Sequence, residues 1–205
     1  MIITVLNGSP KGLTSVTMQY VRFLQKKYPQ HELHILNVCQ DIKRLEDSED
    51  AFREVIGTIQ ASDAVLWATP VYVLLVPGPN KQFVELIFER SAQTAFHGKY
   101  TATLTTSVRF FDHTAHAYLN AICDDLRMHY VGAYSAEMFD LLKEQEQKRL
   151  MFFWQDFIHA AEECRSTQRS YVPIIRLPPR LPSKTTRFAS PSWLKASRLI
   201  SVMAS

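Results

Sequence analysis

The sequence predicts one α/β domain with a doubly wound, five-stranded parallel sheet and helices on both faces. Short apolar runs alternate along the chain with stretches in which apolar residues recur every three or four positions, the pattern of strands followed by amphipathic helices. Five such pairs fill about the first 165 residues and suit the strand order 2-1-3-4-5. A chain of 205 residues that is 46% hydrophobic is long enough to bury a large core.

The first two strand–helix pairs are well marked. The apolar run Ile2–Leu6 ends at the turn Asn7-Gly8, as expected of a buried strand. A helix follows, and Pro29 ends it because proline cannot continue a helix. A second strand is expected over Glu32–Val38, and the apolar stripe over residues 52–59 predicts the second helix.

The remaining elements continue the alternation. A third strand, Ala64–Ala68, leads into a long loop over Thr69–Pro79. The last two strands are expected over Tyr100–Thr105 and Tyr130–Ala136. The three helices that complete the pairs are expected around residues 83–90, 115–126 and 150–161.

Charge and composition divide the chain near residue 165. Residues 1–163 carry 15 basic and 20 acidic side chains, whereas residues 164–205 carry eight basic side chains and no acidic one. Residues 166–205 also hold half of the ten prolines. We therefore predict a domain over residues 1–165 and a loosely ordered, basic tail over 166–205, or alternatively a tail that binds an anionic surface. The basic pI does not mark the whole protein as a nucleic-acid binder.

Several classes of protein are excluded. No run of 18 apolar residues is present, so we expect no membrane span, and the N-terminus lacks the features of a signal peptide, which predicts a cytoplasmic protein. The three cysteines are widely spaced without a CxxC motif, so neither a disulfide framework nor a zinc or iron–sulfur site is expected. His113 and His116 follow Asp112 on one helical face, but no third metal ligand lies nearby, and Asp112 is more simply an N-cap.

The segment after the first strand has the chemistry of a phosphate site. It lies at the switch point of the predicted sheet, contains several hydroxyls and Lys11, and leads into a helix N-terminus, where backbone N–H groups favour anions. Neither Gly-x-x-x-x-Gly-Lys nor Gly-x-Gly-x-x-Gly is present, so a monophosphate fits better than a triphosphate or a dinucleotide. The alternative is an ordinary capped strand–turn–helix. The loop Thr69–Pro79 is apolar with an aromatic residue, which suits a flat heteroaromatic ring or the packing of a second subunit.

These two segments together resemble the NAD(P)H-dependent FMN reductase branch of flavodoxin-like proteins. The resemblance rests on Gly8-Ser9-Pro10-Lys11 with Ser15-x-Thr17, and on Pro70-Val71-Tyr72 with Pro77-Gly78-Pro79-x-Lys81-x-Phe83. It implies a flavodoxin-like fold, bound FMN, NAD(P)H as co-substrate and a homodimer. The FMN-binding residues that it implies are Ser9, Lys11, Ser15, Thr17, Pro70, Val71, Tyr72, Thr106 and Ser107. Lys11 stands where arginine is common in the family, and both side chains donate to phosphate.

The expected activity is the transfer of hydride or electrons from NAD(P)H through FMN to a quinone, a flavin or a similar small acceptor. No catalytic side chain is assigned, because the flavin itself carries the hydride step. Arg109, Phe110 or His113 is expected near the ring and could contact a substrate. The alternatives are a non-enzymatic electron carrier of flavodoxin type, or a flavin-free interaction domain on the same fold.

Overall fold

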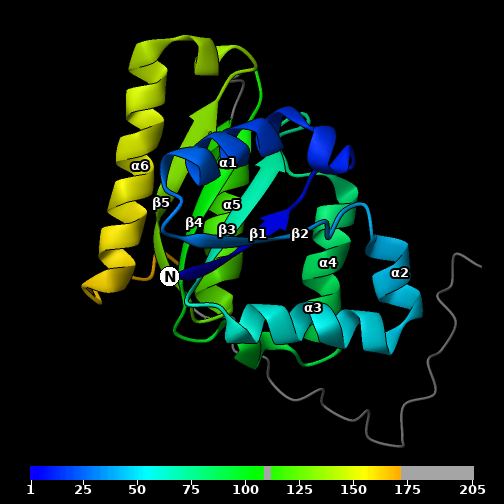
Figure 1. The fold of residues 1–205 in the computed structure, drawn as a ribbon. Helices are drawn as coiled ribbons and strands as arrows, with labels where there is room; N and C mark the ends of the chain where they lie inside the picture. The colour runs from blue at the N-terminus through cyan, green and yellow to red at the C-terminus, as the bar shows by residue number, and fades with distance from the viewer. Residues whose placement is uncertain (109–111, 172–205) are drawn as a thin grey trace, which may run out of the picture. The chain divides into compact units, whose positions relative to one another are not determined.

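The sheet of the protein is parallel throughout and has the strand order β2-β1-β3-β4-β5 (Figure 1). The structure is a computed structural model, which describes residues 1–108 and 112–171. Its strands are β1 (Ile2–Asn7), β2 (Glu32–Leu36), β3 (Ala64–Pro70), β4 (Tyr100–Thr106) and β5 (His129–Ala136). The predicted fold class and strand order are confirmed.

Helices connect the strands and cover both faces of the sheet. The α-helices are α1 (Val16–Lys27), α2 (Ile42–Asp47), α3 (Glu49–Ala61), α4 (Gly78–Glu89), α5 (Asp112–Asp125) and α6 (Glu144–Glu162). The short 3₁₀ turns are η1 (Gly12–Thr14), η2 (Gln93–Phe96) and η3 (Asp140–Leu142). Helices α1 and α6 pack on one face, and α3, α4 and α5 pack on the other (Figure 1).

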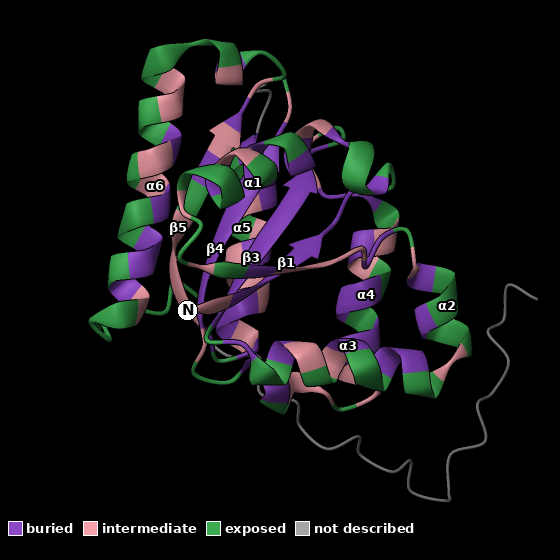
Figure 2. Ribbon diagram, viewed as in Figure 1, coloured by how far each residue is buried: buried purple, intermediate pink, exposed green. Residues whose placement is uncertain are grey.

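Two buried clusters, one on each face, form the core (Figure 2). Trp154 of α6 packs with α1 on one face, and Trp67 of β3 packs with α3 and α5 on the other; both indole rings are at most 1% exposed. Strands β3 and β4 are buried along their whole length, as expected of a parallel sheet covered on both sides. This arrangement leaves the carboxyl ends of the strands as the edge where loops can form a site.

The element boundaries differ from the predictions in a few places. Strand β3 continues through Thr69 and Pro70 because these residues still pair with Thr105 and Thr106 of β4. Helix α2 is not predicted by periodicity, because its six residues bury only Ile42 and Leu45.

The segment that follows α6 is tied to the domain as far as the structure describes it. The carboxylate of Asp124 accepts the backbone N–H groups of Ser170 and Tyr171, at 2.8 and 2.9 Å. Residues 172–205 lie outside the described residues, so the tail predicted from residue 166 stays a prediction. Within the described part of the chain, no helix is both long and apolar enough to cross a membrane.

Candidate functional site

A cavity of about 340 Å³ lies at the carboxyl edge of the sheet, where four loops meet. Its lining comes from the segments after β1, β3, β4 and β5, which are neighbours in the sheet. The described residues that line it are Ser9, Lys11, Ser15, Val16, Thr17, Pro70, Val71, Tyr72, Thr106, Ser107, Val108 and Met138. All nine residues that the sequence analysis selected are therefore brought together around one space. That they hold FMN stays a prediction.

The loop after β1 is fixed by contacts to its backbone. The N–H of Gly8 donates to the carbonyl of Ala68, and its own carbonyl accepts from the Cys39 thiol at 2.9 Å. A Cβ on Gly8 would lie 2.3 Å from Nδ2 of Asn80 and 2.7 Å from Oγ1 of Thr69. Only glycine therefore fits here, and its position sets where the following serine enters the cavity. Burial raises the pKa of the Cys39 thiol to about 12, so the group is a neutral donor.

The start of α1 presents hydroxyls and free N–H groups to the same cavity. Ser15 caps the helix, because its Oγ accepts the N–H of Met18 at 3.2 Å. Its hydroxyl proton stays available to another acceptor, since a hydroxyl can accept and donate at once. The first N–H groups of an α-helix have no partner within the helix and favour an anion.

A pair of hydroxyl groups joins the start of α1 to the end of β4. Oγ1 of Thr17 lies 2.6 Å from Oγ1 of Thr106, and both side chains are buried. The pair links α1 to the end of β4 across 89 residues of sequence. It therefore fixes the spacing between the predicted phosphate loop and the predicted ring pocket.

The loop after β3 is a tight hairpin with unusual backbone angles. The N–H of Val71 donates to the carbonyl of Thr106, and the N–H of Tyr72 donates to that of Leu75. Between them, Val73 and Leu74 have φ angles of +47° and +75°, a region that β-branched residues rarely adopt. Two consecutive positive φ angles are typical of a type I′ turn, which favours asparagine and glycine. The hairpin stores strain next to the cavity.

A second, more open hollow of about 470 Å³ adjoins the end of β5. Asp112, His113, His116 and Arg149 line it. His113 is thus placed in this hollow rather than among the residues that line the first cavity, whereas Arg109 and Phe110 lie outside the described residues. Burial lowers the pKa of His116, and the nearby Asp112 carboxylate opposes that shift. In residues 1–108 and 112–171, no three His, Cys, Asp or Glu side chains are grouped as metal ligands.

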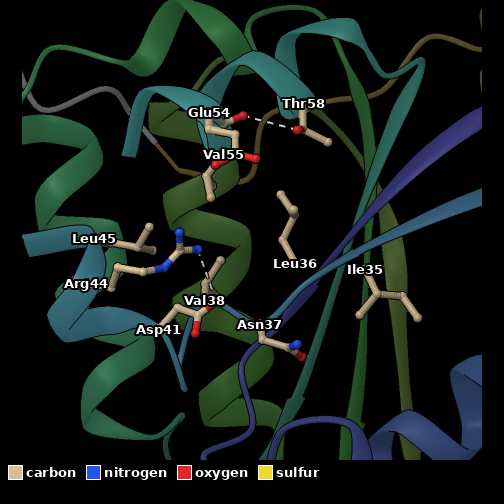
Figure 3. Close-up of a pocket in the computed structure, with 10 residues that line it drawn as sticks. All are labelled: Ile35, Leu36, Asn37, Val38, Asp41, Arg44, Leu45, Glu54, Val55 and Thr58. Atoms are coloured by element: carbon tan, nitrogen blue, oxygen red, sulfur yellow. Dashed lines mark hydrogen bonds and ion pairs between the residues drawn. The ribbon is translucent and has the colours of Figure 1, made fainter. Parts of the chain in front are cut away.

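A third hollow, of about 220 Å³, lies between the end of β2 and helices α2 and α3 (Figure 3). Of its three charged lining residues, Asp41 and Arg44 form an ion pair of 3.4 Å. Asn37 connects this hollow to the end of β1, because its Oδ1 accepts a hydrogen bond from Nδ2 of Asn7 at 2.8 Å. None of the nine predicted residues lines this hollow, so we regard it as a support of the loop.

Comparison with known proteins decides the family. The model of the family described as NADPH-dependent FMN reductase matches residues 1–140, about two thirds of the chain. The chain belongs to the NADPH-dependent FMN reductase family. The predicted family is therefore confirmed, and the protein is an oxidoreductase that uses FMN and NAD(P)H. No protein of the curated set matches it.

Solved structures agree with the fold of an FMN reductase. The flavoenzyme FerB from Paracoccus denitrificans, an NAD(P)H:(acceptor) oxidoreductase, is 21% identical with a TM-score of 0.62, covering 79% of this chain and 97% of its own. RosB, solved with a bound riboflavin-phosphate intermediate, is 13% identical with a TM-score of 0.65. The match covers 94% of this chain and 97% of RosB. An FMN-dependent azoreductase from Bacillus anthracis is 11% identical with a TM-score of 0.51. The match covers 81% of this chain and 100% of the azoreductase. At these identities the likeness shows the fold alone.

Three residues that line the cavity of this FMN reductase are not predicted from its sequence. Val16 lies between two residues that were selected, and Val108 directly follows Ser107. Met138 lies just beyond β5, whose carboxyl end the switch-point rule does not single out. All three are apolar, so no motif of polar residues marks them.

Proposed function

We propose that this cavity holds FMN, with the phosphate at the loop after β1 and the ring between the loops after β3 and β4. The enzyme then passes electrons from NAD(P)H to a quinone, a free flavin or a similar small acceptor. The observation that carries the proposal is the convergence of the nine residues implied by the resemblance, from three strand ends, on a single cavity. Its volume lies in the range of about 300 to 1,000 Å³ that is typical of cofactor sites.

The polar end of the cavity suits a phosphate. Ser9, Ser15 and Thr17 are at most 4% exposed, so their hydroxyls are held in place before a ligand arrives. Lys11 adds one positive charge, and the N-terminus of α1 adds its dipole. Of the described residues that line the cavity, none is acidic. A dianion therefore meets donors and no like charge.

The apolar end suits the isoalloxazine ring. Pro70 and Val71 are buried walls, whereas Tyr72 is half exposed at the mouth. These side chains keep water from one side of the ring and orient it, and Thr106 and Ser107 close the other side. Bound FMN supplies the hydride acceptor, and the protein supplies position and charge.

A pair of capping serines tests the phosphate assignment. Ser15 caps α1 and Ser48 caps α3, each with a 3.2 Å bond from a backbone N–H, so alanine at either position removes an equivalent cap. We expect Ser15→Ala to weaken FMN binding while riboflavin, which lacks the phosphate, is little affected. Ser48→Ala should leave both affinities unchanged. Equal FMN affinity in the two variants, measured by quenching of flavin fluorescence, would contradict the assignment.

We also propose that the protein is a homodimer with the cavity near its interface. Six large apolar side chains that follow the ends of β3, β4 and β5 are exposed: Tyr72, Val73, Val108, Met138, Phe139 and Leu142. Three of them, Tyr72, Val108 and Met138, line the cavity, and exposed apolar side chains beside a cavity suit an interaction surface. Sedimentation analysis of the wild type and of Phe139→Asp tests this: a dimer should become a monomer, and a monomeric wild type would refute it. The cytoplasmic location stays a prediction.

Kinetics separate the reductase from an electron carrier. Rapid mixing of the FMN-loaded protein with NADPH should bleach the flavin, and a quinone or free FMN should then restore the absorbance in repeated turnovers. A protein that takes up FMN but reacts with neither NADH nor NADPH would favour the electron carrier.

A further inference from the structure

A buried carboxylate lies directly behind the ring end of the cavity. Asp112, the first residue of α5, is 8% exposed, and its Oδ2 accepts from Oγ of Ser107 at 2.7 Å and from Oγ of Ser135. Ser107 follows β4 and lines the cavity, while Ser135 belongs to β5. One carboxylate thus joins a helix N-terminus to the ends of two strands.

Two hydroxyl donors and the N-terminus of α5 compensate the charge of this carboxylate only in part. Its second oxygen, Oδ1, is buried and has no hydrogen-bond partner. Among residues 1–108 and 112–171, no cationic side chain forms an ion pair with Asp112. Arg149 lines the same hollow, but its guanidinium donates to both oxygens of Glu146 at 3.0 and 2.9 Å. Proteins rarely bury a carboxylate oxygen without a partner, and such exceptions concentrate at functional sites.

The same contact fixes how Ser107 can act. A serine hydroxyl has one proton, and here Ser107 gives it to Asp112. Toward any other neighbour, including a molecule in the cavity, its oxygen therefore acts as an acceptor. The Asp112 carboxylate thus makes Ser107 a hydrogen-bond acceptor toward the cavity, and it makes the electrostatic potential beside Ser107 more negative.

We propose that Asp112 is a positioning residue that, through Ser107, lowers the reduction potential of FMN in the cavity. This inference rests on the proposed function. A hydride from NAD(P)H brings two electrons and one proton, so the bound flavin becomes more negative by one charge. A nearby carboxylate that forms no ion pair with the described residues opposes that gain, so it stabilises the oxidised state relative to the reduced state. The reduced flavin is then a stronger donor to its acceptor.

The test compares buried aspartates at opposite ends of α5. Asp112→Asn removes the charge and keeps the shape, and we expect it to raise the two-electron midpoint potential of bound FMN. A change of about tenfold in the affinity ratio of oxidised to reduced flavin corresponds to roughly 30 mV. Asp124→Asn is the matched control, because Asp124 is 2% exposed and also accepts two hydrogen bonds, from Ser170 and Tyr171. The midpoint potential of FMN bound to Asp124→Asn should equal that of the wild type.

Ser135→Ala separates charge from hydrogen bonding. It removes one donor but keeps the carboxylate, so the potential should not rise. If Asp112→Asn does not fold, Asp112→Ser replaces it with the same expected rise. An FMN-loaded wild type whose Asp112 variants have an unchanged potential, or a Ser135→Ala variant that reproduces the rise, would overturn this inference alone. A wild type that takes up no FMN would overturn the proposed function as well.

Discussion

Substitution of Gly8 by alanine tests the close packing of the loop after β1 most directly. The added methyl group would lie 2.3 Å from Nδ2 of Asn80 and 2.8 Å from Cβ of Thr69. Both neighbours are at most 1% exposed and are joined by a hydrogen bond of 3.1 Å, so neither can move freely. Overpacking of a rigid site costs about 1 to 3 kcal/mol, and the strained hydrogen bond adds about 1 kcal/mol. We therefore expect Gly8→Ala to lose about 2 to 4 kcal/mol of unfolding free energy.

The assay measures stability and cofactor binding on the same variant. Urea unfolding gives the free-energy change, and fluorescence quenching gives the FMN dissociation constant, which should increase because the loop that carries Ser9 is displaced. Gly57→Ala is the control, since no atom lies within 4 Å of its added methyl group in α3. Alanine in this helix should stabilise the protein by roughly 0.5 to 1 kcal/mol. If Gly8→Ala were as stable as the wild type with unchanged FMN affinity, the packing argument would be wrong.

Three further predictions concern the hydroxyl pair, the hairpin and two partly buried histidines. Thr17→Val leaves the Thr106 hydroxyl unpaired and should cost about 1 to 3 kcal/mol in urea unfolding, whereas Thr17→Ser should keep most of the stability; equal losses would contradict the role of the pair. Val73→Gly relieves a positive φ at a side chain that is 83% exposed, so it should stabilise by about 1 kcal/mol, and a loss of stability would refute the strain. Burial lowers the pKa values of His31 and His116 below the usual 6.5, so the unfolded chain binds protons first on acidification. Stability should therefore be full above about pH 6.5 and fall below it, and the fall should be smaller in His116→Gln.

The sequence predicts the sheet well because its three central strands, β1, β3 and β4, are buried on both faces. Val5 and Leu66 belong to apolar runs that contain little else, and such runs bounded by turn residues are a strong local signal. The switch point follows from topology, and the hydroxyls near it, Ser9 and Thr17 among them, are visible in the sequence. Val71 is predicted through the resemblance of its loop to the FMN reductase family, and all three side chains line the same cavity.

Features that depend on contacts between distant residues could not be predicted in this way. The sequence suggests Asp112 as a helix cap, but its bonds to Ser107 and Ser135 depend on how β4, β5 and α5 meet. The positive φ angle of Val73 goes against its local preference, and the pairing between Tyr72 and Leu75 holds the hairpin in this conformation. Met138 enters the cavity from a segment with no recognisable pattern.

The most direct test of the central claim is an absorbance spectrum of the purified protein, taken before and after the addition of FMN and then NADPH under anaerobic conditions. We predict the spectrum of a tightly bound flavin, at one FMN per chain, that bleaches on addition of NADPH. A protein that takes up no FMN, or whose bound flavin keeps its absorbance in the presence of both NADH and NADPH, would contradict the claim that this cavity is the flavin site of a reductase.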